Sequence, residues 1–160
     1  MVMHKSVLLD TSFFIRFLND GDKLYNNADA YFRYFIQNDI TMVVSTILIA
    51  EYCVIGNITE LPLKNLQILP FNINHAKRTG EFAKIAFENK NILDLNNRNI
   101  IPNDTKLFAQ ADIELSIEYY LTSDTQSKKI YDLLKDKNPI NFKFIDINTP
   151  TTETFGVLFT

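Results

Sequence analysis

Four acidic residues stand where the surrounding pattern gives them no evident structural partner: Asp10, Glu51, Asp104 and Asp124. Asp10 ends the apolar run at 7–9, and Asp124 follows a similar run at 119–122. Glu51 and Asp104 fall on the apolar faces of two predicted helices. Carboxylates that converge repel one another unless a cation lies between them. These residue types therefore predict a metal site with oxygen ligands, provided that the fold brings the four positions together.

Each of the four residues also has an ordinary structural interpretation. Asp10, Asp104 and Asp124 all lie at the start of a predicted helix, where Asp is a common N-cap. Glu51 could instead form a buried ion pair with a Lys or Arg. Asp112 competes with Asp104, but it is rotated toward the edge of the apolar stripe, so we expect it to be solvated. The metal hypothesis therefore depends on the set and not on any single residue.

The energy of such a cluster allows only two outcomes. If all four carboxylates meet within about 5 Å, each pair repels by roughly 3 kcal/mol at an effective dielectric constant of about 20. Summed over all pairs, this repulsion approaches the whole stability of a domain. We therefore expect the cluster to be filled by a divalent cation or not to form.

Length and composition indicate one packed domain. The chain has 160 residues, of which 46% are hydrophobic, and 13 are Phe, which is enough for a substantial core. The formal charge of −3 argues mildly against a pure nucleic-acid-binding module, which is usually basic. No apolar run is long enough for a secretion signal or a membrane span, so we expect a cytoplasmic protein.

The scarcity of Cys and His restricts the kind of metal. One Cys and two His exclude an intrachain disulfide and disfavour a zinc site. Oxygen ligands favour one or two ions of Mg²⁺ or Mn²⁺. The sequence also contains no dinucleotide fingerprint, phosphate-binding loop or nucleophile elbow.

Short apolar runs alternate with helical patterns along the chain. We expect strands at 5–9, 40–44, 66–71, 118–122 and 142–147. We expect helices at 11–19, 22–37, 46–56, 74–90, 104–117 and 125–136. Strands separated by helices predict right-handed crossovers and a mostly parallel sheet covered on both faces, in an α/β fold with three α/β/α layers. In such folds ligands bind at the carboxyl ends of the strands.

Local signals set several boundaries. Ser45 is predicted to cap a helix that Gly56 ends. Pro102 is predicted to break the chain before the helix that starts near Asp104, which leaves an exposed loop at 91–103. We place the domain at residues 1–147 and a C-terminal tail at 148–160. We expect the TFGVLF run of this tail to pair at a sheet edge or to contact a partner.

Four segments, in order, resemble the PIN domain family and more narrowly its VapC-type toxin ribonucleases. The segments are VLLDTSFFI at 7–15, STILIAEY at 45–52, NDTKLFAQA at 103–111 and YYLTSD at 119–124. The resemblance spans nearly the whole chain and implies a PIN-like nuclease domain. It implies that the catalytic residues and metal ligands are Asp10, Glu51, Asp104 and Asp124. It implies supporting roles for Thr11, Ser12 and Ser123.

The same resemblance implies a function. This is metal-dependent hydrolysis of phosphodiester bonds in RNA by an endoribonuclease, with an antitoxin partner and a homodimeric state. One departure is Gln126, which stands where the family often carries a further acidic residue, so a second ion has one ligand fewer. Lys128 and Lys129 follow it, either as phosphate contacts or as part of a solvated helix face.

Two other functions remain open from the sequence. One is a non-toxin or catalytically degenerate PIN-like module that processes RNA or mediates an interaction. The other is a metal-dependent phosphatase of doubly wound fold. The phosphatase would need a second Asp two residues after Asp10, and Ser12 occupies that place.

Overall fold

The computed structural model describes residues 4–93 and 100–156, and at its centre lies a five-stranded sheet in which all neighbouring strands are parallel. The strands are β1 (Ser6–Leu9), β2 (Thr41–Ser45), β3 (Leu66–Leu69), β4 (Ile117–Thr122) and β5 (Lys143–Asp146). Their order across the sheet is β3-β2-β1-β4-β5. The chain therefore continues from central β1 to one side and returns with β4 on the other. This confirms the predicted α/β fold with its parallel sheet.

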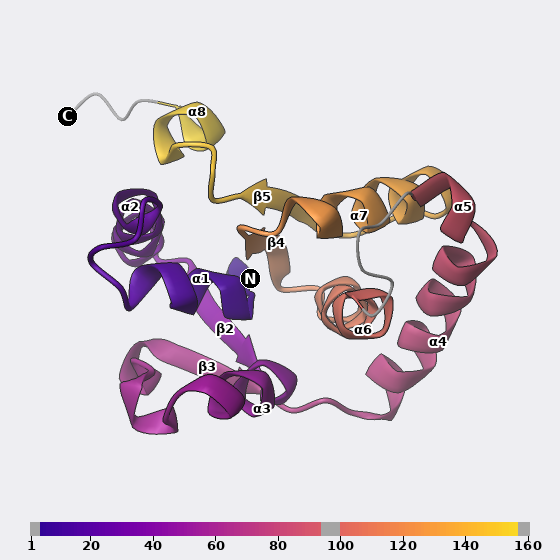
Figure 1. Ribbon diagram of the computed structural model, residues 1–160, viewed down its shortest axis with the longest axis horizontal. Helices are drawn as coiled ribbons and strands as arrows, with labels where there is room; N and C mark the ends of the chain where they lie inside the picture. Colours follow the sequence, from indigo (N-terminus) through magenta and orange to yellow (C-terminus); the bar gives the residue numbers. More distant parts are fainter. Residues whose placement is uncertain (1–3, 94–99, 157–160) are drawn as a thin grey trace.

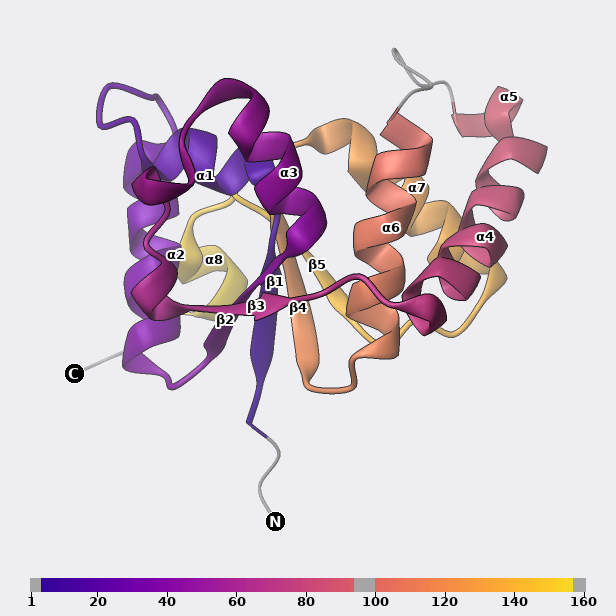
Figure 2. The same cartoon turned by 90° about the horizontal axis from the view of Figure 1, so that it is seen from below.

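Helices cover both faces of the sheet (Figure 1, Figure 2). One layer contains α1 (Thr11–Phe17), α2 (Tyr25–Gln37), α3 (Thr46–Ile55) and α8 (Thr151–Phe155). The other contains α4 (Ile73–Glu88), α5 (Lys90–Leu93), α6 (Ile100–Ile113) and α7 (Thr125–Lys137). Two short 3₁₀ helices, Ile58–Glu60 and Leu63–Asn65, connect α3 to β3. Among the described helices, none has the length and apolar character needed to cross a membrane.

The sheet divides the apolar core into two parts. Val7 and Leu9 of β1 pack toward α1 and α2, whereas Leu8 packs toward α4, α6 and α7. All four residues of β1 are buried, as expected for a parallel strand covered on both faces. The aromatic residues of α2 belong to the first part, with Tyr31 and Phe35 fully buried.

Helix α6 differs from its predicted bounds. It begins at Ile100, four residues earlier than expected, and ends at Ile113. Pro102 lies in its first turn, where the missing N–H would have no partner within the helix in any case. The predicted loop at 91–103 is therefore wrong at both ends, and residues 94–99 lie outside the described residues. Asp104 is consequently in the second turn and is not an N-cap.

Helix α3 begins and ends as predicted, but its buried face differs. The Ser45 hydroxyl accepts a hydrogen bond from the Ile47 N–H at 3.0 Å, and Gly56 is the C-cap. The apolar face on which Glu51 was predicted to lie is not buried along its whole length, because Val54 and Ile55, three and four residues after Glu51, are 84% and 66% exposed. Their helix is apolar on nearly every side, so periodicity alone could not identify the buried face.

The described part of the C-terminal tail contains a short helix and no strand. Residues 151–155 make α8, and the Phe155 ring stacks on Tyr34 with a centroid distance of 4.1 Å. The same ring is nearly perpendicular to that of Tyr119 in β4, with a centroid distance of 5.5 Å. The expected edge pairing is therefore wrong for this part of the tail, which packs on its own chain. The rest of the TFGVLF run, beyond Gly156, lies outside the described residues.

Candidate active site

Asp10 lies directly after β1 and is held by hydroxyl groups from two adjacent chain segments. It occupies the N-cap position of α1, but its side chain makes no capping bond. Instead, its Oδ2 atom accepts hydrogen bonds from Ser12 Oγ at 2.8 Å and from Thr122 Oγ1 at 2.7 Å. The Ser123 N–H donates to Ser12 Oγ at 2.9 Å. The pairing of β1 with β4 thus fixes the orientation of this carboxylate.

Glu51 connects α3 to the start of α1. Its Oε2 atom accepts a hydrogen bond from Thr11 Oγ1 at 2.6 Å. Burial raises the pKa of Glu51, the Thr11 hydrogen bond lowers it, the charge of Asp10 raises it again and Lys106 lowers it. Among the described residues no Lys or Arg forms an ion pair with this half-buried carboxylate. The described part of the chain thus contains no buried ion pair of Glu51.

Asp104 brings the four acids into one electrostatic neighbourhood. Its side chain is partly exposed as a whole, yet its Oδ2 atom is buried and has no hydrogen-bond partner among the described residues. Burial and the charges of Asp10, Asp124 and Glu51 raise the pKa of Asp104 to about 8. In the metal-free protein this carboxyl group therefore holds a proton near neutral pH. Repulsion between the converging carboxylates thus contributes to the raised pKa, and the retained proton relieves it, an outcome that the two alternatives predicted from the sequence did not include.

Asp124 is a helix cap as well as a member of this group. Its Oδ1 atom accepts a hydrogen bond from the Gln126 N–H at 2.8 Å, at the start of α7. The capping interpretation is therefore correct for Asp124. The side-chain oxygen Oε1 of Gln126 is itself buried without a hydrogen-bond partner among the described residues. Gln126 therefore provides a neutral amide oxygen at the position where a further acidic residue was expected from the resemblance.

The four carboxylates are neighbours without forming a closed coordination shell. Within residues 4–93 and 100–156, no three His, Cys, Asp or Glu side chains are arranged to hold one metal ion. Local hydroxyl and N–H donors engage the carboxylates of Asp10, Glu51 and Asp124 instead. The donor set itself fits a hard divalent cation, because every donor atom is an oxygen and the Oδ2 atom of Asp104 has no partner in the described part of the chain. Binding would require these side chains to turn toward the ion.

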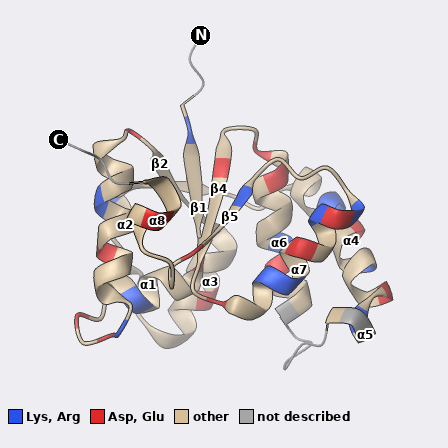
Figure 3. Ribbon diagram, turned by 90° about the horizontal axis from the view of Figure 1, so that it is seen from above, with Lys and Arg blue, Asp and Glu red and all other residues tan. Residues whose placement is uncertain are grey.

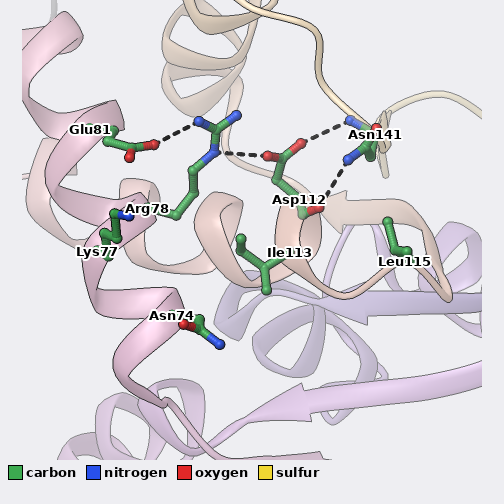
Figure 4. Close-up of a pocket in the computed structure, with 8 residues that line it drawn as sticks. All are labelled: Asn74, Lys77, Arg78, Glu81, Asp112, Ile113, Leu115 and Asn141. Atoms are coloured by element: carbon green, nitrogen blue, oxygen red, sulfur yellow. Dashed lines mark hydrogen bonds and ion pairs between the residues drawn. The ribbon is translucent and has the colours of Figure 1, made fainter.

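Asp112 is buried, and the prediction that it is solvated is wrong. It is 4% exposed, and its Oδ2 atom accepts a hydrogen bond from Arg78 Nε at 2.9 Å (Figure 4). The Asn141 N–H donates to its Oδ1 atom at 2.9 Å. Both oxygens are therefore occupied. Beside this network lies an open pocket of about 460 Å³, close to the amino ends of β4 and β5 and so remote from the four acids.

Two basic residues that the sequence did not single out, Arg16 and Lys106, interact with residues of the site. Lys128 pairs with Asp132 at 2.7 Å, and both side chains are more than half exposed. Basic and acidic positions alternate along α7 (Figure 3), which fits the solvated helix face. Arg16 instead lies close to the site, with its Nε atom 3.4 Å from Ser123 Oγ, and Lys106 acts on Glu51.

Sequence reasoning also passed over the role of Thr122. Its hydroxyl both donates to Asp10 and accepts from the Asp124 N–H at 3.0 Å, so it links two of the acids. A signal was available, because a residue two positions before a strand-end Asp lies on the same face of the strand. The neighbouring strand was needed to show which acid it meets.

Comparisons with known proteins identify the fold. No protein-family model matches the sequence, and no curated protein matches it. Among solved structures, FitAcB from Neisseria gonorrhoeae has a TM-score of 0.58 and 20% identity, covering 79% of this chain and 93% of that chain. VapBC2 from Rickettsia felis, in a structure bound to a promoter DNA fragment, has a TM-score of 0.53 and 17% identity, covering 88% of this chain and 99% of that chain. VapC20 from Mycobacterium tuberculosis, a Sarcin-Ricin loop cleaving toxin, has a TM-score of 0.50 and 13% identity, covering 76% of this chain and 92% of that chain. The chain therefore has a PIN-like fold.

Proposed function

We propose that this chain is a metal-dependent endoribonuclease and the toxin of a type II toxin–antitoxin pair. The observation that carries the proposal is the Oδ2 atom of Asp104, which is buried without a partner among the described residues and lies near the charges of Asp10, Glu51 and Asp124. Such a cluster lowers the stability of the empty fold, so a need for a bound cation explains why the chain contains it. Support for RNA as substrate comes from one structure of the same fold, which is a Sarcin-Ricin loop cleaving toxin.

The proposed roles of the residues follow from where each is held. Asp10 and Asp124 would ligate the ion directly, because the sheet fixes their backbone at the ends of β1 and β4. Glu51 and Asp104 would ligate it directly or through water. When bound, Mg²⁺ or Mn²⁺ lowers the pKa of a coordinated water and neutralises charge on the scissile phosphate. The hydroxyls of Ser12 and Thr122 keep the Asp10 carboxylate in one orientation.

Two further side chains fit the task of holding RNA. Arg16 reaches toward Ser123, but one of its NH groups is already paired with Asp22 at 2.8 Å. Lys106 stands on α6 within the electrostatic reach of Glu51. We propose that these two cations contact the phosphates on either side of the scissile bond. A flexible single strand can present a phosphate to such a site more readily than a duplex can.

Titration with Mn²⁺ tests the proposal without requiring the natural RNA. At a Mn²⁺ concentration about 100 times its dissociation constant, we expect the free energy of unfolding to rise by about 2.7 kcal/mol. This corresponds to a rise in melting temperature of roughly 5–10 °C. Thermal unfolding with and without Mn²⁺ measures this, and cleavage of an unstructured RNA oligonucleotide should depend on the same ion. Asp132→Asn, which changes an exposed acid on α7, is the control and should respond as the wild type does.

A catalytically degenerate PIN-like module is the second candidate. It is favoured by one observation, namely that local donors engage the carboxylates and no three of them form a metal-binding group in the described part of the chain. Such a module should show neither the Mn²⁺-dependent rise in melting temperature nor RNA cleavage. Absence of both effects would therefore replace the ribonuclease proposal with this one.

The toxin role leads to a separate prediction about cells. We expect expression of the chain alone to slow growth of a bacterial host severalfold, because a ribonuclease without its inhibitor degrades essential RNA. Growth curves with and without a small partner protein encoded alongside measure this, and the partner should restore growth. Two of the similar structures are named as VapBC2 and FitAcB assemblies, which supports an antitoxin partner. Harmless expression of a chain that cleaves RNA well in vitro would contradict the toxin role.

We further propose that the protein is a cytoplasmic homodimer. Exposed apolar residues remain at the end of α3, where Val54 and Ile55 face away from the core, and such positions are suited to burial against another protein surface. Sedimentation of the purified chain measures its oligomeric state directly.

A further inference from the structure

Tyr120 is a buried tyrosine whose hydroxyl group is not used by the surrounding core. The residue lies in β4, is fully buried, and its hydroxyl has no hydrogen-bond partner among the described residues. Its ring packs edge-on against Phe108 of α6 with a centroid distance of 4.9 Å. Phe108 follows Asp104 by four residues on the same helix, so both lie on one helix face. The ring therefore lies one helical turn below the Asp104 carboxyl group.

The sheet register places Tyr120 beneath the other acids as well. Tyr120 pairs with Leu8 of β1, two residues before Asp10. It also shares a face of β4 with Thr122, because alternate residues of a strand point to the same side. Thr122 donates its hydroxyl proton to Asp10 at 2.7 Å. Tyr120 thus lies two residues before Thr122 along β4 and beside the residue two positions before Asp10 in β1, on the strand segments that lead to the acidic site.

Electrostatics agrees with this position. Burial, followed by the charges of Asp10, Asp104, Glu51 and Asp124, raises the pKa of Tyr120 well above its usual value. The phenol therefore keeps its proton and remains a hydrogen-bond donor. Asp104 Oδ2, in turn, is a buried oxygen without a hydrogen-bond partner among the described residues, and it becomes an acceptor once the carboxyl group loses its proton. Both oxygens are thus buried without a partner among the described residues, and the charge of Asp104 acts on the Tyr120 phenol.

The alternative is that Tyr120 has a purely structural role and only fills space in the core. Its ring does fill space, together with Phe108 and the neighbouring Phe142 and Phe144. A phenylalanine would pack as well there and would avoid burying an unpaired hydroxyl, which is unfavourable. The packing of the core therefore gives no reason for the hydroxyl, whereas the acidic site lies close enough for its charges to act on the phenol.

We propose that Tyr120 is a positioning residue of the acidic site, and that its hydroxyl donates a hydrogen bond to Asp104 when a divalent cation is bound. The donated bond would hold the second oxygen of that carboxylate toward the ion. Groups that orient metal ligands in this way typically change metal affinity by about 10- to 100-fold when they are removed. This inference rests on the proposed metal-dependent function.

The test compares two tyrosine variants that each lose one hydroxyl. We expect Tyr120→Phe to bind Mn²⁺ roughly 10-fold more weakly than the wild type. Tyr131→Phe is the matched control, because Tyr131 packs against the same Phe108 but donates its hydroxyl to the Phe142 carbonyl at 2.9 Å. Its Mn²⁺ affinity should equal that of the wild type. The paramagnetic resonance signal of free Mn²⁺, recorded during a titration, gives each dissociation constant without reference to activity.

Two further measurements separate positioning from simple packing. In the metal-free state Tyr120→Phe should melt no lower than the wild type, whereas Tyr131→Phe should melt lower because it loses a made hydrogen bond. In RNA cleavage, Tyr120→Phe should need a higher Mn²⁺ concentration for half-maximal rate, while its rate at saturating Mn²⁺ stays close to that of the wild type. A purely structural role would not shift this midpoint.

The outcomes distinguish this inference from the function on which it rests. Equal Mn²⁺ affinity in the wild type and Tyr120→Phe would overturn the role of the hydroxyl and leave the proposed function standing. Absence of Mn²⁺ binding to the wild type would overturn the proposed function, and the role of Tyr120 with it.

Discussion

Asp10→Asn is expected to abolish RNA cleavage, with a loss of roughly 10³-fold or more in rate. The substitution keeps the shape of the side chain but removes its negative charge. A charge pair about 4 Å apart at an effective dielectric constant of 20 is worth about 4 kcal/mol, and each 1.4 kcal/mol corresponds to tenfold in rate. Cleavage of an RNA oligonucleotide under saturating Mn²⁺ measures the loss.

The fold of this variant should remain intact. The side-chain carbonyl of Asn can still accept the hydrogen bonds that Ser12 and Thr122 donate to Asp10. The variant also removes one of the charges that raise the pKa of Asp104, so the metal-free protein should be no less stable than the wild type. Asp132→Asn on the exposed face of α7 controls for loss of charge as such. Full activity of Asp10→Asn with Mn²⁺ present would refute the assignment of Asp10.

Much of the fold follows from patterns that act locally. Runs such as 7–9 and 119–122 predicted strands because short, continuous apolar segments are typical of parallel strands that are buried on both faces. The bounds of α6 were harder to predict, since Pro102 stops a helix in its interior but is tolerated in a first turn. The buried face of α3 could not be predicted at all, because a helix with apolar residues on nearly every side carries no directional signal.

The site was also predictable in part, because some of its positions follow from local sequence patterns. Strand ends and helix starts are readable from sequence, so the region shared by Asp10 and Asp124 could be predicted from the parallel topology alone. The burial of Asp112 depends on Arg78, which is 34 residues away in sequence, and no local pattern reveals such a partner. Tyr120 required both the β1–β4 register and the packing of α6. The role of the four acids as metal ligands remains a prediction.

Asp104→Asn is expected to stabilise the metal-free protein at pH 8 and to flatten the dependence of its stability on pH. The pKa of Asp104 is raised from 3.8 to about 8 in the folded protein. Between these values the folded protein keeps a proton that the unfolded chain has lost. The free energy of unfolding should therefore be highest in acid and should fall as pH rises toward 8, by up to about 1.4 kcal/mol per pH unit. Asn is neutral throughout and removes this contribution.

Urea unfolding in EDTA at pH 5, 6, 7 and 8 measures the slope for both proteins, with Asp132→Asn as the control that should keep the slope of the wild type. Adding Mn²⁺ at pH 8 should restore stability to the wild type, because a cation offsets the repulsion that deprotonation of Asp104 creates. The same addition should stabilise Asp104→Asn much less. If the wild type and Asp104→Asn lose stability in parallel between pH 5 and 8, the buried Oδ2 atom is not where the repulsion acts. The metal-dependent function would then lose the observation that carries it.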